Sequence, residues 1–118
     1  MGIEKRETTR YEFEGEVKIK ILFTPSENLK EVEAKIGNVS AGGLFIKTDE
    51  PFEEGALADL AFKLPDKLPA NTLGLIKWAK PNEGIGIEFF YATEEEKQAI
   101  IESLRRAYGQ EKQKSAQD

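Results

Sequence analysis

Alternation of apolar and polar side chains along the first ninety residues predicts six short β-strands. The segment 16–23 shows the pattern most clearly, because Val17, Ile19, Ile21 and Phe23 fall on one face and charged residues occupy much of the other. Five further strands are expected between turns that contain Gly, Pro or Asn: residues 31–36 and 85–90 alternate in the same way, residues 44–47 form an apolar run, and residues 57–64 and 72–80 supply the other two. Short strands at this spacing favour a small antiparallel barrel or sandwich.

The period of the pattern becomes helical after residue 92. Thr93 is the expected N-cap, because Glu96 follows it at the capping-box spacing, and Gly109 suits the position just beyond the helix. One apolar stripe is expected to pack the helix on the barrel, and it consists of Ile100, Ile101, Leu104, Ala107 and Tyr108. Residues 110–118 have no apolar anchor and are expected to form a disordered tail.

A chain of 118 residues is long enough for one core and too short for a second independent domain. We therefore expect an all-β fold with a C-terminal helix, in which residues 1–11 form an N-terminal arm, residues 12–92 a six-stranded antiparallel β-barrel and residues 93–109 the helix.

Composition favours binding over catalysis. The chain contains no cysteine and no histidine, which excludes thiol nucleophiles, serine–histidine triads and zinc sites built on these residues. Its 17 basic and 22 acidic side chains give a net charge of −5, which disfavours generic DNA or RNA binding. No apolar run is long enough to span a bilayer, and no secretory signal follows the start. We expect a cytoplasmic protein that is not an enzyme, needs no cofactor or metal, and binds neither DNA nor membrane.

Two polar features do not follow from folding needs alone. Arg6 and Arg10, with Lys5 beside the first, place three cations within six residues of an acidic chain. The segment 38–43, Asn-Val-Ser-Ala-Gly-Gly, lies between two predicted strands. Each feature also has a plain structural interpretation. The arginines could belong to a solvated arm, and the segment could be a bend in which polar side chains cap the backbone and the glycines supply positive φ.

Taken together and in this order, the two features resemble the PilZ domain, a bacterial receptor module for cyclic di-GMP. That family carries an RxxxR motif in an N-terminal loop and a [D/N]xSxxG motif on its barrel. In this chain the motifs stand as RETTR, residues 6–10, and NVSAGG, residues 38–43. The Trp-bearing fifth strand, the sixth strand and the helix also resemble the family, and single-domain members from gliding bacteria of the delta (myxobacterial) group look particularly similar. The resemblance implies a single PilZ-type domain over residues 1–109.

The resemblance also implies a ligand site shared by the arm and the barrel. Arg6 and Arg10 would grip guanine and phosphate, because a guanidinium group can bind either one bidentately and can stack on a base. Asn38 and Ser40 would hydrogen-bond a base edge or a phosphate oxygen. The other expected site residues are Gly42 and Gly43, which leave the backbone open for contact, and Lys5, which can influence whether one nucleotide or an intercalated pair is bound.

We expect the protein to signal by ordering its arm. Cyclic di-GMP would fold residues 1–10 across the barrel and so create or hide a surface for a partner protein, with motility, pilus or polysaccharide machinery as the candidates that the family suggests. The alternative is a PilZ-like adaptor that does not bind nucleotide. A barrel that stacks single-stranded nucleic acid is disfavoured, because no strand face combines exposed aromatic residues with cations. Trp78 is expected in the core or at the barrel rim, because it shares a face with Ile76; the alternative is a stacking platform for a base.

Overall fold

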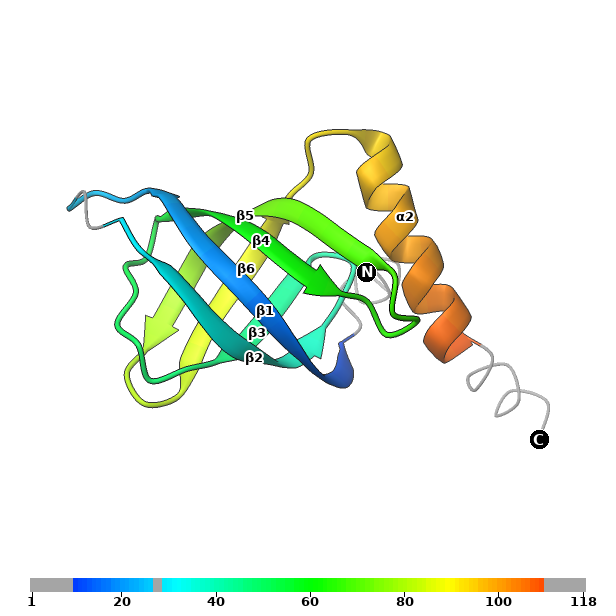
Figure 1. The fold of residues 1–118 in the computed structure, drawn as a ribbon, viewed down its shortest axis with the longest axis horizontal. Coiled ribbons are helices and arrows are strands. Elements are labelled where there is room, and N and C mark those ends of the chain that lie inside the picture. Colours follow the sequence, from blue (N-terminus) through cyan, green and yellow to red (C-terminus); the bar gives the residue numbers. More distant parts are fainter. Residues whose placement is uncertain (1–9, 27–28, 110–118) are drawn as a thin grey trace, which may run out of the picture.

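The alternating segments form the strands of one closed barrel (Figure 1). The computed structural model describes residues 10–26 and 29–109, so most of the expected arm and the expected tail lie outside it. The strands are β1 (Tyr11–Phe23), β2 (Glu31–Val39), β3 (Gly43–Lys47), β4 (Leu57–Lys63), β5 (Pro69–Lys80) and β6 (Gly84–Phe90). Every neighbouring pair is antiparallel, and the barrel closes in the order β1-β2-β3-β6-β5-β4. The predicted fold class, an all-β barrel with a C-terminal helix, is confirmed.

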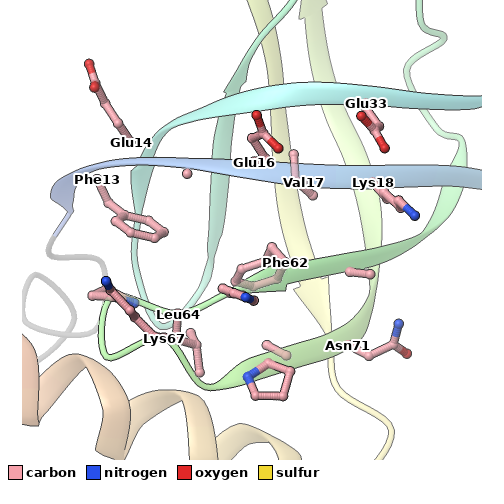
Figure 2. Close-up of a pocket in the computed structure, with 16 residues that line it drawn as sticks. Phe13, Glu14, Glu16, Val17, Lys18, Glu33, Phe62, Leu64, Lys67 and Asn71 are labelled. Atoms are coloured by element: carbon pink, nitrogen blue, oxygen red, sulfur yellow. The ribbon is translucent and has the colours of Figure 1, made fainter.

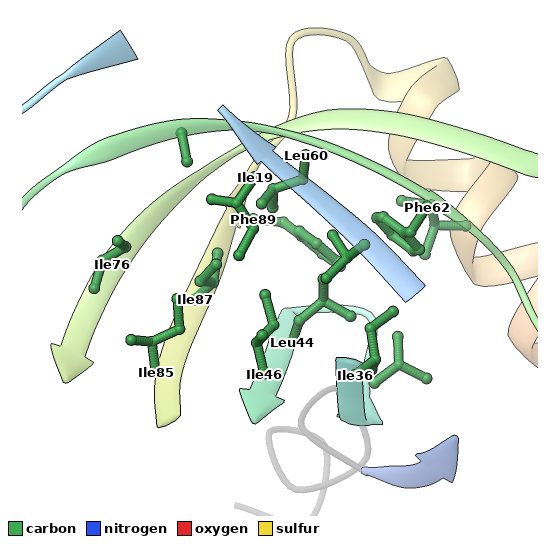
Figure 3. Packing of buried hydrophobic residues seen from close by; sticks show 14 of the residues in the cluster. Ile19, Ile36, Leu44, Ile46, Leu60, Phe62, Ile76, Ile85, Ile87 and Phe89 are labelled. Atoms are coloured by element: carbon green, nitrogen blue, oxygen red, sulfur yellow. The ribbon is translucent and has the colours of Figure 1, made fainter. Parts of the chain in front are cut away.

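The inward-facing residues of all six strands fill the barrel (Figure 3). Ile19, Ile46, Leu60 and Ile76 have no exposed surface, and Ile85 is almost as completely buried. Burial of each such side chain contributes about 1.5–3 kcal/mol to folding. The barrel is therefore a packed core without a central channel, and any ligand must bind to its outside or its ends.

Three strands are longer than their apolar pattern predicts. β1 begins at Tyr11 and β5 at Pro69, because each pairs with a neighbour beyond the alternating run. β2 continues to Val39, although Gly37 was expected to interrupt it. A register shift between Ile36 and Asn38 in the pairing with β3 absorbs the glycine as a bulge. The predicted bend is thereby reduced to the three residues between Val39 and Gly43.

The chain then forms α2 (Glu94–Leu104), followed by the π-helical turn η1 (Arg105–Gly109), where one continuous α-helix was expected. Thr93 is the N-cap as predicted, and its Oγ accepts from the Glu96 amide at 3.1 Å. The Glu96 carboxylate accepts from the Ala92 amide and from the Thr72 hydroxyl of β5, at 2.9 Å for the hydroxyl. The cap therefore also ties the helix to the barrel. No helix in the described part of the chain is long and apolar enough to cross a membrane.

The end of the helical segment contacts two parts of the barrel. Arg106 donates to the Asp66 carboxylate in the β4–β5 turn at 3.0 Å. Burial alone would raise the pKa of Asp66, but the hydroxyl of Ser103, the guanidinium of Arg106 and the amide of Leu68 hold it below its usual value. The ring of Tyr108 stacks on Tyr11 with centroids 4.3 Å apart, and its hydroxyl donates to the carbonyl of Glu12. The helix end is thus fixed beside the start of β1.

Candidate functional site

Pairing of β1 with β2 brings part of each sequence motif together. Arg10 directly precedes β1, and the register sets Tyr11 opposite Val39 and Glu12 opposite Asn38. As a result the Arg10 guanidinium donates to the Asn38 side-chain oxygen at 3.2 Å, across 28 positions of sequence. Arg10 is exposed, so its remaining donors can reach a ligand. Lys5 and Arg6, also expected in the site, lie outside the described residues.

Ser40 organises the bend between β2 and β3. Its amide donates to the Gly43 carbonyl at 2.9 Å, and its Oγ accepts from the amides of Gly42 and Gly43 at 3.1 and 3.2 Å. The residue is only 7% exposed. Both acceptor positions of the hydroxyl therefore serve the backbone, as the plain structural interpretation of this segment had it. The hydroxyl proton remains available as a donor to an anion.

The end of β6 holds the same bend from the other side. The amide of Phe89 donates to the Gly42 carbonyl at 2.8 Å, and the hydroxyl of Tyr91 donates to the Ala41 carbonyl. Burial, together with the charge of Glu96, raises the pKa of Tyr91, so the phenol stays protonated and remains a donor. The bend is preorganised by the strand opposite it and does not need a ligand to take its shape.

The two glycines of the motif differ in how much room a side chain would have at each position. A Cβ added to Gly43 would lie 1.9 Å from the Ile87 carbonyl oxygen, so the close approach of β3 to β6 requires glycine there. A Cβ on Gly42 would meet nothing nearer than Ser40 Oγ at 3.8 Å. Neither glycine has positive φ, a conformation that the described glycines show only at Gly55 and Gly84. The expectation that this bend needs left-handed backbone is therefore wrong.

A surface cavity of about 300 Å³ lies directly beside the bend. Five segments line it: the residue before β1, the bend, β3, β5 and β6. We call this cavity the bend pocket, and its lining includes Arg10, Ser40, Gly42, Gly43, Lys77, Trp78 and Glu88. Four of the seven predicted site residues therefore line one cavity, and a fifth, Asn38, is hydrogen-bonded to Arg10.

The position of Trp78 differs from the expectation. A register shift between Ile76 and Trp78 inserts Lys77 as a bulge, so Ile76 faces the core while Trp78 lies on the outer surface, opposite Gly86. A Cβ on Gly86 would lie 2.2 Å from the indole nitrogen, so the indole lies against the bare backbone of β6. Phe45 supports it from β3, with ring centroids 5.7 Å apart. The half-buried indole is an aromatic wall of the bend pocket, and the Lys80 ammonium lies over its ring at 5.6 Å from the centroid.

The bulge also brings a second cation to the pocket. Lys77 lies 3.5 Å from the Glu88 carboxylate, and both side chains are more than half exposed. Such an exposed pair is weak, so an anionic ligand could draw Lys77 away from Glu88. Lys77 and Glu88 were not among the predicted site residues, and for Trp78 a place in the core or at the rim was preferred to a stacking role. The one signal for them is Gly86 within an apolar strand, because a strand glycine often marks a bulge or a close approach.

Comparison with known proteins gives the following matches. The profile of the family described as "PilZ domain" matches residues 4–106. Among solved structures, the Bacillus subtilis inhibitor of motility MotI/DgrA superposes with a TM-score of 0.61 at 21% identity, over 82% of this chain and 48% of that one. The PilZ domain of CeSA from a cellulose-synthesizing bacterium gives a TM-score of 0.63 at 18% identity, over 87% and 98% of the two chains.

A third solved structure, MrkH from K. pneumonia in its apo state, gives a TM-score of 0.67 at 16% identity, over 90% of this chain and 51% of that one. The chain thus spans about half the length of MotI/DgrA and of MrkH. Comparison with curated protein sequences gives no match. At these identities the structural likenesses establish the fold.

Proposed function

Because the chain belongs to the PilZ domain family, whose profile matches residues 4–106, we propose that it is a receptor for cyclic di-GMP that binds at the bend pocket. PilZ domains are binding modules. The observation that carries the proposal is the convergence of Arg10, Ser40, Lys77 and Trp78 on one cavity, although they come from three separate parts of the sequence.

The chemistry of the pocket matches the parts of a cyclic dinucleotide. Arg10 and Lys77 supply positive charge for a phosphate, and the Arg10 fork can also bind the Hoogsteen edge of guanine bidentately. The Trp78 indole offers a face on which a base can stack, a contact worth about 1–3 kcal/mol per base. Ser40 can donate its hydroxyl proton to a phosphate oxygen. Arg6, and Lys5 beside it, would complete the grip from the arm.

A titration with cyclic di-GMP tests the proposal, followed by calorimetry and by the fluorescence of Trp78, the single tryptophan of the chain. We expect micromolar affinity, which corresponds to about −8 kcal/mol, and a change in indole emission on binding. Arg10→Ala should weaken binding at least about tenfold, because hydrogen bonds to charged groups contribute about 1.5–3 kcal/mol. Arg105→Ala is the matched control, since Arg105 is exposed on the helix and pairs only with Glu102 in the described structure.

Absence of binding at millimolar nucleotide by the folded protein would refute the receptor function. Equal weakening by Arg10→Ala and Arg105→Ala would instead show that binding lies elsewhere than the bend pocket.

The proposed signal is the ordering of residues 1–10 by the ligand. Fixing a residue costs about 1–2 kcal/mol of conformational entropy, so the contacts of the arm with nucleotide must offset this cost. Amide hydrogen exchange reports the change directly. We expect residues 1–12 to gain protection at saturating nucleotide, and unchanged exchange there would contradict the latch mechanism while leaving nucleotide binding intact.

An adaptor that does not bind nucleotide is the second candidate, and one surface favours it. Phe23 and Phe90 are 61% and 63% exposed. Phe23 was expected on the same face as Ile21, but a register shift between these two residues in the pairing with β4 turns it to the outer face. The strand register places Leu57, Leu73 and Leu75 between Phe23 and Phe90. A protein partner could cover this apolar face. The titration separates the two candidates, since the adaptor predicts no heat and no thermal shift with nucleotide.

The downstream partner is proposed only by class. Two of the similar structures are described as an inhibitor of motility and as a domain from a cellulose-synthesizing bacterium. We propose a protein of the motility, pilus or polysaccharide machinery as the target, and capture from a bacterial extract with and without cyclic di-GMP would identify it.

A further inference from the structure

A cavity of about 980 Å³ lies between the first half of β1 and the β4–β5 hairpin (Figure 2). None of the residues of the bend pocket lines it. Its size is at the upper end of the roughly 300–1,000 Å³ of typical binding clefts. Apolar side chains form much of its lining, and Figure 2 shows Phe13 projecting into it from β1, with Phe62 and Leu64 contributed by β4 and the turn that follows. We call this cavity the hairpin groove.

The groove exists because β1, followed from Phe23 back towards Tyr11, stops pairing with β4 while it still pairs with β2. The pairing of β1 with β2 runs from Lys20 back to Tyr11 and is interrupted by one bulge, whereas its pairing with β4 starts only at Val17 opposite Phe62. A bulge between Glu12 and Gly15 accompanies this divergence. Phe13 and Glu14 form the bulge, and Gly15 and Glu16 pair with β2. Within the described residues, none of the four pairs with β4, so the edge of β1 that faces the hairpin is free along residues 13–16. An unpaired strand edge beside an apolar surface can accept an added strand.

The length of the free edge suits a short extended segment. Four residues of β-strand span roughly 13 Å, enough for a segment that places two side chains towards the groove and two towards solvent. The side chains turned inward would contact Phe13 and Phe62, since these line the groove. Main-chain hydrogen bonds would supply affinity and the alternate side chains selectivity.

Charge around the groove selects what can bind. Glu14 and Glu16 are exposed on β1 beside the free edge, and Lys63 and Lys67 line the side formed by the hairpin. A second copy of the same edge would align carboxylates with carboxylates, which disfavours pairing between two β1 strands. In the register of β1 with β4, Glu16 lies level with Lys63, the last residue of β4, and Glu14 lies beyond it. Glu14 attracts a cation carried by an added strand, whereas Lys63 and Lys67 repel it. Such a cation is therefore expected beside Glu14, away from the hairpin.

We propose that the hairpin groove binds an extended peptide segment of a partner protein by β-strand addition to residues 13–16. The segment alternates apolar residues, which contact Phe13 and Phe62, with polar ones, and it carries a lysine or arginine beside Glu14. This site is separate from the bend pocket and does not depend on nucleotide binding.

The probe is a capped, fluorescein-labelled hexapeptide in which valine alternates with threonine and one central lysine, titrated against the full chain without nucleotide. We expect saturable binding and slower amide exchange at residues 13–16. Replacing the lysine of the peptide by glutamate should weaken binding about fivefold, the upper range for a cross-strand charge pair. A peptide of the same composition with its valines grouped together should bind worse, because it cannot place them all on one face.

The charge-reversal variant Glu14→Lys makes the test specific. Glu14 is exposed, so the barrel should tolerate the change. The variant should lose affinity for the lysine peptide and gain it for the glutamate peptide by a similar factor. Glu31→Lys is the matched control, because Glu31 is exposed on β2 and lies opposite Lys20, near the far end of β1 from the groove. Absence of binding, binding with no preference between the two peptides, or equal effects of the two variants would overturn the proposal.

Discussion

At the scale of single residues, the two glycines of the motif have different roles: Gly43 is required for folding, whereas Gly42 is not required for it and is left open for contact with a ligand. Gly43→Ala should destabilise the protein by about 1–3 kcal/mol, the usual cost of overpacking, because its Cβ would overlap the Ile87 carbonyl. Gly42→Ala should leave stability nearly unchanged, because that position is open. Urea unfolding followed by tryptophan emission measures both. Equal destabilisation by the two substitutions would show that the spacing of β3 and β6 does not determine the need for glycine.

Tyr91 gives a second prediction at this scale. Tyr91→Phe removes the hydrogen bond to the Ala41 carbonyl and keeps the ring packed on Phe89. We expect a loss of about 1 kcal/mol in unfolding free energy, together with faster amide exchange in residues 40–43. If exchange in the bend is unchanged, Ser40 and the Phe89 amide suffice to hold it.

Individual residues also show where prediction from sequence ends. Glu96 was expected to close the cap at Thr93, and it does lie there, but its carboxylate also binds Thr72 on a strand far away in sequence. Trp78 was assigned to the face of Ile76 by strict alternation, and the bulge at Lys77 reverses that assignment. Alternation predicts the face of a residue only while the register is regular, and nothing local in residues 72–80 marks the extra residue.

At the scale of elements, the attachment of the helix to the barrel should weaken at acidic pH. The pKa of Asp66 is lower in the folded protein than its ordinary value of 3.8. Its charged form therefore contributes stability that is fully present above pH 3.8 and is lost as the pH falls through the lower, folded-state value. We expect Asp66→Asn to lower Tm at pH 7. The difference in Tm between the variant and the unsubstituted protein should shrink as the pH falls below 3.8.

Thermal melts between pH 2 and pH 7 measure this difference. Asp49→Asn is the control, because Asp49 is an exposed carboxylate in the loop between β3 and β4. A gap between the Asp66→Asn variant and the unsubstituted protein that stays constant over this range would show that the ion pair with Arg106 does not anchor the helix.

The elements themselves were largely predictable, and their ends were not. Six strands and a helix follow from the change of hydrophobic period, because each element buries one face against the same core. The extension of β1 back to Tyr11 depends on pairing with Val39, which is a property of two segments and not of either alone. The change to π-helical geometry at Arg105 coincides with the contacts of Arg106 and Tyr108 to the barrel.

At the scale of the whole molecule, closure of the barrel should set the folding rate. The seam pairs β1 with β4, for example Ile19 with Leu60, so two distant segments must meet before the barrel closes. Non-local pairing of this kind places folding in roughly the millisecond-to-second range. Stopped-flow refolding followed by tryptophan emission measures it. Complete refolding within microseconds would show that closure of the seam does not limit the rate.

The site could be predicted only in part, for a reason that belongs to this scale. Arg10, Asn38 and Ser40 could be recognised from the sequence, because they belong to two motifs in a fixed order. The β1–β2 register brings Arg10 and Asn38 together in the structure. Lys77, Trp78 and Glu88 reach the same pocket from β5 and β6. Their arrival there depends on the strand order of the closed barrel, which no single segment encodes.

The stack of Tyr11 on Tyr108 has a practical consequence for engineering. Tyr11 lies near the start of the described fold and Tyr108 near its end, and their rings stack with centroids 4.3 Å apart. A domain whose two ends lie close together can be inserted into a loop of a host enzyme with little distortion of the host. Such an insertion would test whether the proposed binding of cyclic di-GMP beside Arg10 can be transmitted, through the aromatic pair, as a change in the activity of the host.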